Sequence, residues 1–283
     1  MVSAGRKREM GRGERTLPGV WRLRLPLPWP AVPHGNAWAI AAGDGIVLVD
    51  TGVHEPGSMA QLELALAMVG RRLEDVRLLV CTHAHSDHYG QAATILERVG
   101  CELWMHPNYA HATSKGPEAT RFAGFPAPDR ELLDGVEVKT DLGAWRAVET
   151  PGHAPSHVCL WQPERRLLIS GDHLLGRVTL SFDFGYTPDP VGEFLASLDR
   201  VEALDARLCL AGHGRTFTDA QGHIVAYREL IADGLATVEQ LLTNGPLTAA
   251  ELVPRIYGEG LPPLVAEWRE KEVLSFLRHL EVR

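Results

Sequence analysis

One short segment of this 283-residue sequence gathers side chains of the kinds that bind metal ions. It reads THAHSDH and offers His83, His85, Asp87 and His88 directly after the apolar run 76–81. Closely spaced imidazoles and a carboxylate repel one another when charged, unless a cation compensates them. In an extended loop the first two histidines point the same way, whereas the last two residues begin a helix and can face a second position. The segment therefore predicts a site for zinc, manganese or iron.

Three later segments place a ligand-type residue beside glycine, just past a predicted strand. They are the turns that contain His153 (PGH), Asp172 with His173 (GDH) and His213 (GHG). Glycine lets the backbone come close to an ion. A single Gly-His or Gly-Asp turn is explained equally well as a tight turn that binds nothing. Four such segments, all at strand ends, favour one shared site.

The elements that must carry these loops mix strands and helices up to about residue 215. Strands are predicted at 20–26, 36–42, 46–50, 76–81, 101–106, 145–150, 157–161, 166–170 and 207–211. Helices are predicted at 56–69, 89–99 and 191–204. Two strand-rich halves with helices between them indicate a core of two packed sheets flanked by helices.

From Thr218 onward the pattern predicts helices only. Thr248 and Glu251 have the spacing of a capping box at the start of one helix, and residues 273–280 form another. We therefore expect a disordered tail over 1–16, a catalytic domain over 17–217 and a small helical subdomain over 218–283.

Together the motifs THAHSDH, PGH, SGD and GHG resemble the metallo-β-lactamase fold superfamily over about residues 18–215. The resemblance implies an αββα sandwich of the α/β (α+β) class, with the metals in a shallow cleft at one edge. It implies two sets of ligands and a bridge: His83, His85 and His153 for one metal, Asp87, His88 and His213 for the second, and Asp172 between them. IVLVDTG (46–52) resembles the early strand of that superfamily, in which Asp50 would support the metal loop and fix a histidine tautomer.

Departures from known branches of the superfamily narrow the function. The β-lactamases use Cys where Asp172 stands, and the flavodiiron relatives carry a carboxylate where His85 stands. The nucleases with an inserted domain have a longer segment before His213. The ligands resemble those of glyoxalase II, but its glutathione-binding region is not recognisable here. The C-terminal segment resembles a small winged-helix segment of a group of hydrolases that includes an endoribonuclease.

The resemblance implies a zinc-dependent hydrolase with two Zn²⁺, and manganese and iron are the alternative metals. A bridging hydroxide, oriented by the catalytic residues Asp87 and Asp172, would attack an ester, thioester or lactone of a small metabolite. A metal-dependent phosphodiesterase or endoribonuclease is the alternative, and an iron-dependent persulfide dioxygenase is the third. A metal-binding or nucleic-acid-binding module without catalysis is the fourth, which the intact ligand set disfavours.

Four residues near the expected cleft are candidates for substrate contact: His106, His173, Arg177 and Tyr186. For the two histidines a structural role is equally open. Four further histidines, His34, His111, His157 and His223, are expected to be structural or to lie on the surface. The irregular segment 107–131 is expected to form the wall that selects substrates.

The charge and cysteine content limit the partners. A formal net charge of −8 disfavours the cationic footprint that nucleic acid needs. No apolar run reaches the length that spans a bilayer. The four cysteines lack metal-site spacing and read as reduced core thiols, which favours a cytoplasmic protein. We expect a small-molecule substrate and, through the acidic C-terminal region, packing or a homodimer.

Overall fold

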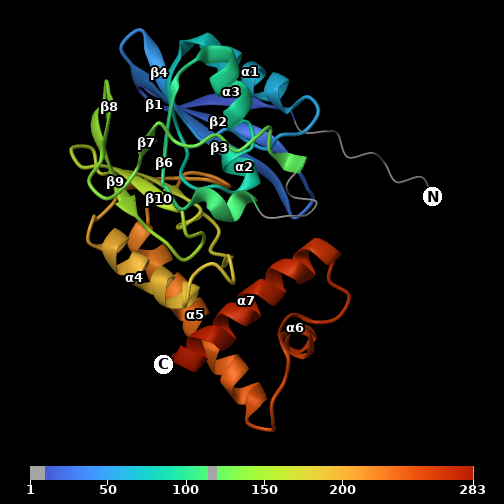
Figure 1. Cartoon of the computed structure of the whole chain (residues 1–283). Helices are drawn as coiled ribbons and strands as arrows, with labels where there is room; N and C mark the ends of the chain where they lie inside the picture. The colour runs from blue at the N-terminus through green and yellow to red at the C-terminus, as the bar shows by residue number, and fades with distance from the viewer. Residues whose placement is uncertain (1–9, 114–119, 283) are drawn as a thin grey trace.

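Two β-sheets pack face to face in the computed structural model, which describes residues 10–113 and 120–282 (Figure 1). The first sheet contains β1 (Arg12–Leu17), β2 (Val20–Trp29), β3 (Val32–Ala42), β4 (Gly45–Val49), β5 (Val76–Val80), β6 (Glu102–Met105) and β7 (Arg130–Glu131), in that order across the sheet. The second has the order β12 (Leu208–Ala211), β11 (Leu167–Gly171), β10 (Val158–Gln162), β9 (Gly143–Glu149) and β8 (Glu137–Thr140). With helices on both outer faces, this confirms the predicted αββα sandwich.

Strand direction decides which loops share an edge. Strands β1 to β4 pair antiparallel, and β4 to β7 pair parallel. Parallel neighbours need crossover helices, here α1 (Ser58–Met68) before β5 and α2 (Ser86–Tyr89) with α3 (Ala92–Val99) after it. In the second sheet only β11 and β12 are parallel, joined through α4 (Pro190–Glu202). The carboxyl ends of β5, β9, β11 and β12 therefore carry the ligand loops.

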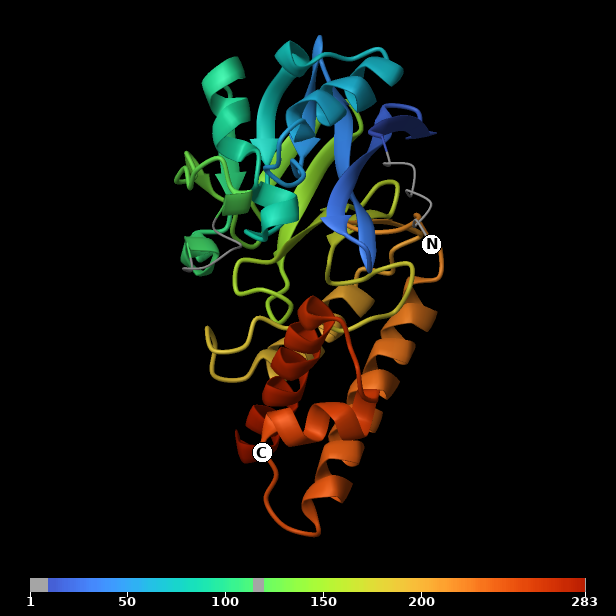
Figure 2. The same ribbon diagram turned by 90° about the vertical axis from the view of Figure 1, so that its right-hand side faces the viewer.

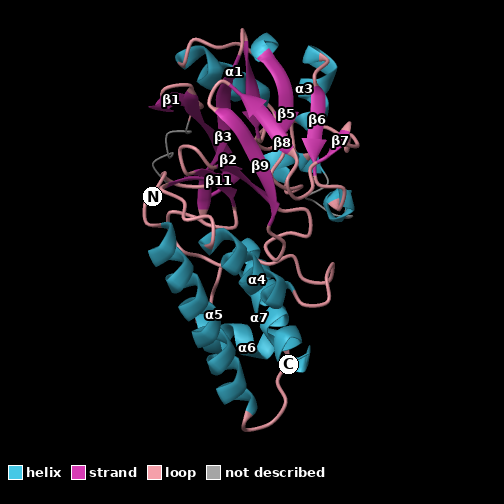
Figure 3. Cartoon of the chain, turned by 90° about the vertical axis from the view of Figure 1, so that its left-hand side faces the viewer, coloured by secondary structure: helices cyan, strands magenta, loops and turns pink. Residues whose placement is uncertain are grey.

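Three apolar clusters form the layers of the sandwich. Trp38, Trp145 and Ile169 belong to the cluster between the sheets. Leu62 on α1 and Ile95 on α3 belong to the cluster on the outer face of the first sheet. In Figure 3 the helices of the second sheet's outer face lie on the opposite side of the molecule from α1 and α3. Each sheet is thus buried on both faces, as expected of a layered α/β core.

The N-terminal prediction needs a correction, because residues 12–16 are not a disordered tail but part of strand β1. This strand pairs antiparallel with β2, and the carboxylate of Glu14 lies 2.6 Å from the guanidinium of Arg22. Gly13 lies so close to the backbone of Ala65 on α1 that a Cβ would collide. Strand pairing and close glycine packing need few apolar side chains, which is why composition gave no sign of them.

The C-terminal part consists of α5 (Ala220–Leu242), α6 (Ala249–Tyr257) and α7 (Pro263–Val282). The predicted capping box is present: Glu251 N donates to Thr248 Oγ1, and Thr248 N donates to the Glu251 carboxylate. Helix α7 begins ten residues earlier than the expected start at 273, since Pro263 occupies its first turn, where proline is tolerated. None of the described helices is long and apolar enough to cross a membrane.

These helices share one apolar cluster with the second sheet. Tyr227 on α5 and Phe276 on α7 belong to the same cluster as Phe194 on α4 and Leu168 on β11. Helix α7 (red) also runs toward the edge of the sandwich, where Trp268 meets Trp29 at the tip of β2 (ring centroids 6.3 Å apart; Figure 2). The C-terminal helices are therefore part of the sandwich's own packing.

We predict that removal of one ring from this shared cluster destabilises the whole chain. Phe276 is 1% exposed and contacts Phe182. Phe276→Ala should lower the free energy of unfolding by about 3–5 kcal/mol in a urea titration, in one transition. Val225→Ala, at a position 48% exposed on α5, is the control and should change it by less than about 0.5 kcal/mol. A separate, early transition for the helices would contradict the shared core.

Candidate metal centre

The structure brings all seven predicted ligands to one edge of the sandwich. His83 and His85 follow β5, and Asp87 and His88 lie on α2. The other three follow β9, β11 and β12: His153, Asp172 and His213. Ligand atoms of these residues form three overlapping sets, each within 4.8 Å: His83 with His85 and His153, His83 with His88 and Asp172, and Asp87 with His88 and His213. We call His83, His85 and His153 the first group, and Asp87, His88, His213 and Asp172 the second group.

In the first group, three ring nitrogens meet. Nδ1 of His85 lies 3.0 Å from Nε2 of His83 and 3.0 Å from Nε2 of His153. The outer nitrogens decide where the protons are. Nδ1 of His153 faces the carbonyl of Ser181 (3.0 Å), and Nε2 of His85 faces the carboxylate of Asp183 (2.8 Å). Both partners only accept, so both rings donate outward and turn a lone pair inward.

The same reasoning fixes His83. Its Nδ1 lies 3.0 Å from the hydroxyl of Thr82. That hydroxyl is 3.0 and 3.1 Å from the two carboxylate oxygens of Asp50, to which it gives its only proton. It must therefore accept from His83, whose Nε2 is left without a proton. The inner nitrogens of the three rings thus converge on one point, an arrangement that suits a cation between them.

The second group mixes lone pairs with carboxylates. Nδ1 of His88 donates to Asp50 (2.8 Å), and Nδ1 of His213 donates to the carbonyl of His34 (3.0 Å). Nε2 of His213 lies 3.1 Å from Oδ2 of Asp87 and 3.1 Å from Oδ2 of Asp172. Without protons on their inner nitrogens, both rings direct lone pairs at negative oxygens.

Two buried atoms of this group have no hydrogen-bond partner among the described residues: Nε2 of His88 and Oδ1 of Asp172, which lie 3.4 Å apart. Oδ2 of Asp172 also lies 3.7 Å from Nε2 of His153 in the first group. Nitrogens bound about 2.0–2.1 Å from a tetrahedral ion lie about 3.3 Å apart, which is close to these spacings. The cluster is therefore able to bind metal ions, and Asp172 reaches both groups.

The two groups differ in the pKa values of their histidines. Burial, followed by repulsion from His85, lowers the pKa of His153 to about 4, and burial, followed by repulsion from His88, lowers the pKa of His83 well below its usual value, so these two imidazoles are neutral. Burial acts against the charged form of His85 too, but the carboxylate of Asp183 outweighs it and raises the pKa of His85. Burial would also lower the pKa of His213, but the carboxylates of Asp172 and Asp87 outweigh it and raise that pKa to about 10. In the protein without metal, protons balance these carboxylates. A metal ion bound there has to replace those protons.

Two residues hold the ligand loops in place. Asp50 lies where the resemblance implied, and besides His88 it accepts from Thr82 N at 2.8 Å. Its φ of 65° lies in the left-handed region, which is uncommon for a non-glycine residue and is found mainly at functional sites. Asn36 was not predicted. Its amide donates to the carbonyls of Ala211 (2.8 Å) and Gly214 (3.0 Å), on either side of His213.

Sequence reasoning also missed three residues that contact the site: Asp183, His111 and His157. Nε2 of His157 accepts from the backbone N–H of Asp172 at 3.1 Å, which fixes that carboxylate's loop. Asp183 accepts from His85, and its Oδ2 lies 3.1 Å from Nδ1 of His111. No short sequence motif identifies these residues, because the hydrogen-bond partner of each one lies elsewhere in the sequence.

The candidates for substrate contact lie in different environments. His173 is fully buried, with its ring 4.7 Å from that of Phe194, and His106 is buried with Nε2 2.9 Å from Glu149. His173 has no exposed surface and His106 has little that a substrate could contact, which agrees with a structural role for both side chains. Tyr186 is 51% exposed, with its ring 5.7 Å from that of His111, and Arg177 is exposed.

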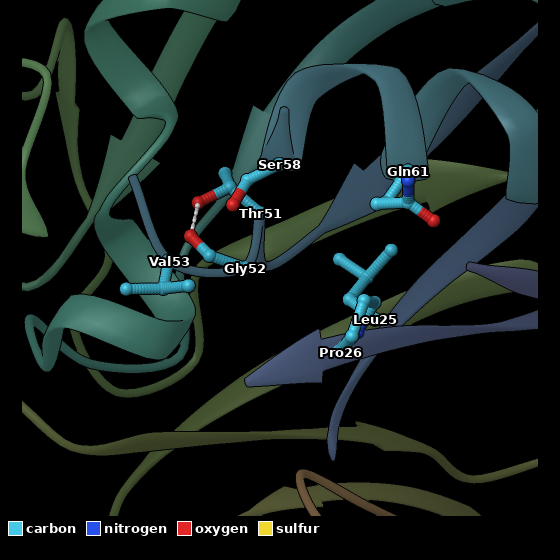
Figure 4. A pocket seen from close by; sticks show the side chains of 7 residues that line it. All are labelled: Leu25, Pro26, Thr51, Gly52, Val53, Ser58 and Gln61. Carbon is cyan, nitrogen blue, oxygen red and sulfur yellow. Dashed lines mark hydrogen bonds between the residues drawn. The ribbon is translucent and has the colours of Figure 1, made fainter. Parts of the chain in front are cut away.

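The segment 107–131 is only partly described, and residues 114–119 lie outside the described ranges. Its described part contains a 3₁₀ turn at Tyr109–Thr113, followed later by β7. A small cavity behind the Asp50 loop is lined by Leu25, Thr51 and Gln61, among others (Figure 4). Its volume of about 10 Å³ holds no more than a water molecule, so it is not a substrate pocket.

We predict that Asp50→Asn weakens metal binding at the second group. An amide oxygen cannot accept from His88 and Thr82 as a carboxylate does, so the His88 ring loses its fixed orientation. The affinity for one of the bound ions should fall about 10–100-fold. Titration against a chromogenic chelator measures this. Asp44→Asn, at an exposed aspartate paired with Arg77, is the control and should leave the affinity unchanged. Equal affinities in the two variants would contradict the role of Asp50.

Comparison with known proteins agrees with this geometry. A beta-lactamase-like protein 2 homolog of Caenorhabditis elegans is 28% identical over 202 residues, which cover 71% of this chain and 63% of that protein, less than two thirds of its length. A probable metallo-hydrolase of Bacillus subtilis (strain 168) is 25% identical over 284 residues, covering 87% and 88%. An atrochrysone carboxyl ACP thioesterase of Aspergillus novofumigatus is 26% identical over 260 residues, covering 86% and 73%.

Among solved structures, a metallo-beta-lactamase family protein from Thermus thermophilus superimposes with a TM-score of 0.80 at 28% identity, covering 95% of each chain. The family model of the metallo-beta-lactamase superfamily matches residues 31–213, the span that holds all seven ligand residues. Since that match covers well over half of the sequence, the chain belongs to the metallo-beta-lactamase superfamily.

Proposed function

We propose that this protein is a metallo-hydrolase that holds two zinc ions and cleaves an ester, thioester or lactone of a small metabolite. One observation carries the proposal. Five imidazoles donate outward to fixed acceptors, and their lone pairs point into a space shared with two carboxylates. Five nitrogens against two carboxylates favour zinc over manganese or magnesium, which prefer oxygen ligands.

The ligands would divide as the resemblance implied. His83, His85 and His153 would hold one ion, Asp87, His88 and His213 would hold the second, and Asp172 would lie between them. Bound in this way, the ions would lower the pKa of a water toward about 7 and neutralise charge that develops on the substrate. The carboxylates of Asp87 and Asp172 would orient the attacking water through hydrogen bonds. The buried outer partners keep every ring fixed, so the site does not rearrange during the reaction.

A thioester or another activated acyl group is the substrate class that we favour. One of the relatives is named as a thioesterase that acts on an acyl carrier protein. Thiolate and alkoxide leaving groups need only modest stabilisation, which a metal ion can give. Arg177 and Arg215, which follow the ligands Asp172 and His213 in the sequence, are exposed and can pair with one carboxylate or phosphate of such a substrate.

A phosphodiester substrate is the second candidate, for a specific reason. Three arginines, Arg22, Arg24 and Arg215, lie close together beside the His213 loop. Arg22 donates to the carbonyl of Gly214 (2.8 Å). Besides burial, the nearby charges of Arg24 and Arg215 lower the pKa of Arg22, while Glu14 opposes them. This group could bind a phosphate next to the second metal position.

One prediction of the proposed function concerns Asp172, the carboxylate between the two metal positions. Asp172→Ala should abolish turnover and lower the occupancy of both metal positions, because the two cations would then face each other without a shared anion. Elemental analysis and an activity assay measure the two effects. Asp199→Ala, at an exposed position on α4, is the control. Normal rates in Asp172→Ala would remove Asp172 from the mechanism.

Another prediction of the proposed function ranks the substrate classes. Values of kcat/KM for a panel of thioesters, esters and lactones should exceed those for a phosphodiester and for labelled single-stranded RNA, and a chelator should abolish each activity. Arg215→Ala should raise KM for acidic acyl substrates more than for neutral ones. Efficient RNA cleavage that declines steeply with salt, without acyl hydrolysis, would establish the phosphodiesterase instead.

A further inference from the structure

One segment that follows β11 supports two of the three histidines of the first group. The carbonyl of Ser181 accepts from Nδ1 of His153 at 3.0 Å, and Oδ2 of Asp183 accepts from Nε2 of His85 at 2.8 Å. The backbone N–H of Asp183 also donates to the carbonyl of His153 at 3.1 Å. Residues 181–183 therefore hold the outer sides of His85 and His153, whereas Asp50 acts on His83 through Thr82 and on His88 directly.

Asp183 is itself held by His111. Nδ1 of His111 lies 3.1 Å from Oδ2 of Asp183, and Nε2 lies 2.8 Å from Oγ of Ser156. That hydroxyl accepts from the backbone N–H of Ala84 at 3.0 Å, so its own proton is free to go to His111. A neutral His111 with its proton on Nδ1 satisfies every partner. His85, His111 and Asp183 thus form a complete hydrogen-bonded set that needs no cation, although their spacing alone would suit one.

His85 needs such support more than its neighbours. It alone among the five ligand histidines presents Nδ1 to the cluster, whereas the others present Nε2. Its side chain is 26% exposed, against 6% for His153 and 0% for His88, so packing confines it least. Rotation of the ring by 180° about χ2 would put a carbon where the nitrogen must be. The bond to Asp183 prevents that rotation.

We propose that Asp183, held by His111, is the positioning residue that fixes the ring of His85 and so presents its Nδ1 to the first metal position. This inference rests on the proposed metal site. The loop that carries Asp183 also contacts the C-terminal helix α7. Phe182 packs on Phe276 of α7 (ring centroids 6.2 Å apart), and Asp189, at the far end of the same loop, lies 2.9 Å from Nδ1 of His279.

The test compares Asp183→Asn with Glu149→Gln. Glu149 forms the same kind of pair with an imidazole, that of His106 at 2.9 Å, but neither residue belongs to the ligand set. Each purified variant is loaded with Zn²⁺ and titrated with a chelator of graded affinity, and circular dichroism checks its fold. Asp183→Asn should weaken one of two ions about 10–100-fold and leave the other unchanged. Glu149→Gln should match the wild-type protein.

Two bound ions of wild-type affinity in Asp183→Asn would overturn the inference but leave the metal site standing. A wild-type protein that binds no metal would instead refute the proposed function. His111→Gln provides a second route should Asp183→Asn not fold, because it leaves the carboxylate in place. It should weaken the same ion by a smaller factor. A Co²⁺-loaded sample should show the change in its visible absorption for both Asp183→Asn and His111→Gln, and an unchanged spectrum would also overturn the inference.

Discussion

Mutual repulsion among the donor atoms is the constraint that the rest of this structure has to satisfy. Nitrogens of neighbouring rings lie 3.0 Å apart, and others face carboxylates in a buried space. Each ring stays there because its outer nitrogen donates to a fixed acceptor. Those acceptors come from five places in the chain: Thr82, Asp183, Asp50, Ser181 and His34. The two sheets serve to bring these acceptors around one point.

The two ligand groups depend on different parts of the fold. The second group is held by the first sheet, through Asp50 after β4 and the carbonyl of His34 on β3. In the first group, His85 and His153 are held by the loop after β11, through Ser181 and Asp183, whereas His83 depends on Asp50 through Thr82. The loop after β11 packs on α7 through Phe182 and Phe276, and Tyr227 of α5 accepts from the backbone N–H of Leu175 near Asp172. The C-terminal helices therefore support the loops behind His85, His153 and Asp172.

The ligands could be predicted from the sequence because each of them lies in a short motif directly after a strand. The sandwich and the crossover helices followed from alternating patterns of the same local kind. Asp183 and Asn36 could not be predicted, since their partners lie 98 and 175 positions away and only the folded chain makes them neighbours. Strand β1 could not be predicted for a related reason. Its backbone pairing with β2 and its glycine contacts with α1 do not change the amino-acid composition of the segment.

The parallel pairing of β11 with β12 has a consequence for how the chain reaches its native state. β12 carries His213 to the site, 130 positions after His83, and it can join β11 only after α4 has crossed over. Such distant contacts carry a large loop-closure entropy and form slowly. During synthesis on the ribosome, the THAHSDH segment emerges long before its last partners do. Assembly of the complete ligand set is thus a late step of folding, and the THAHSDH segment alone cannot seed it.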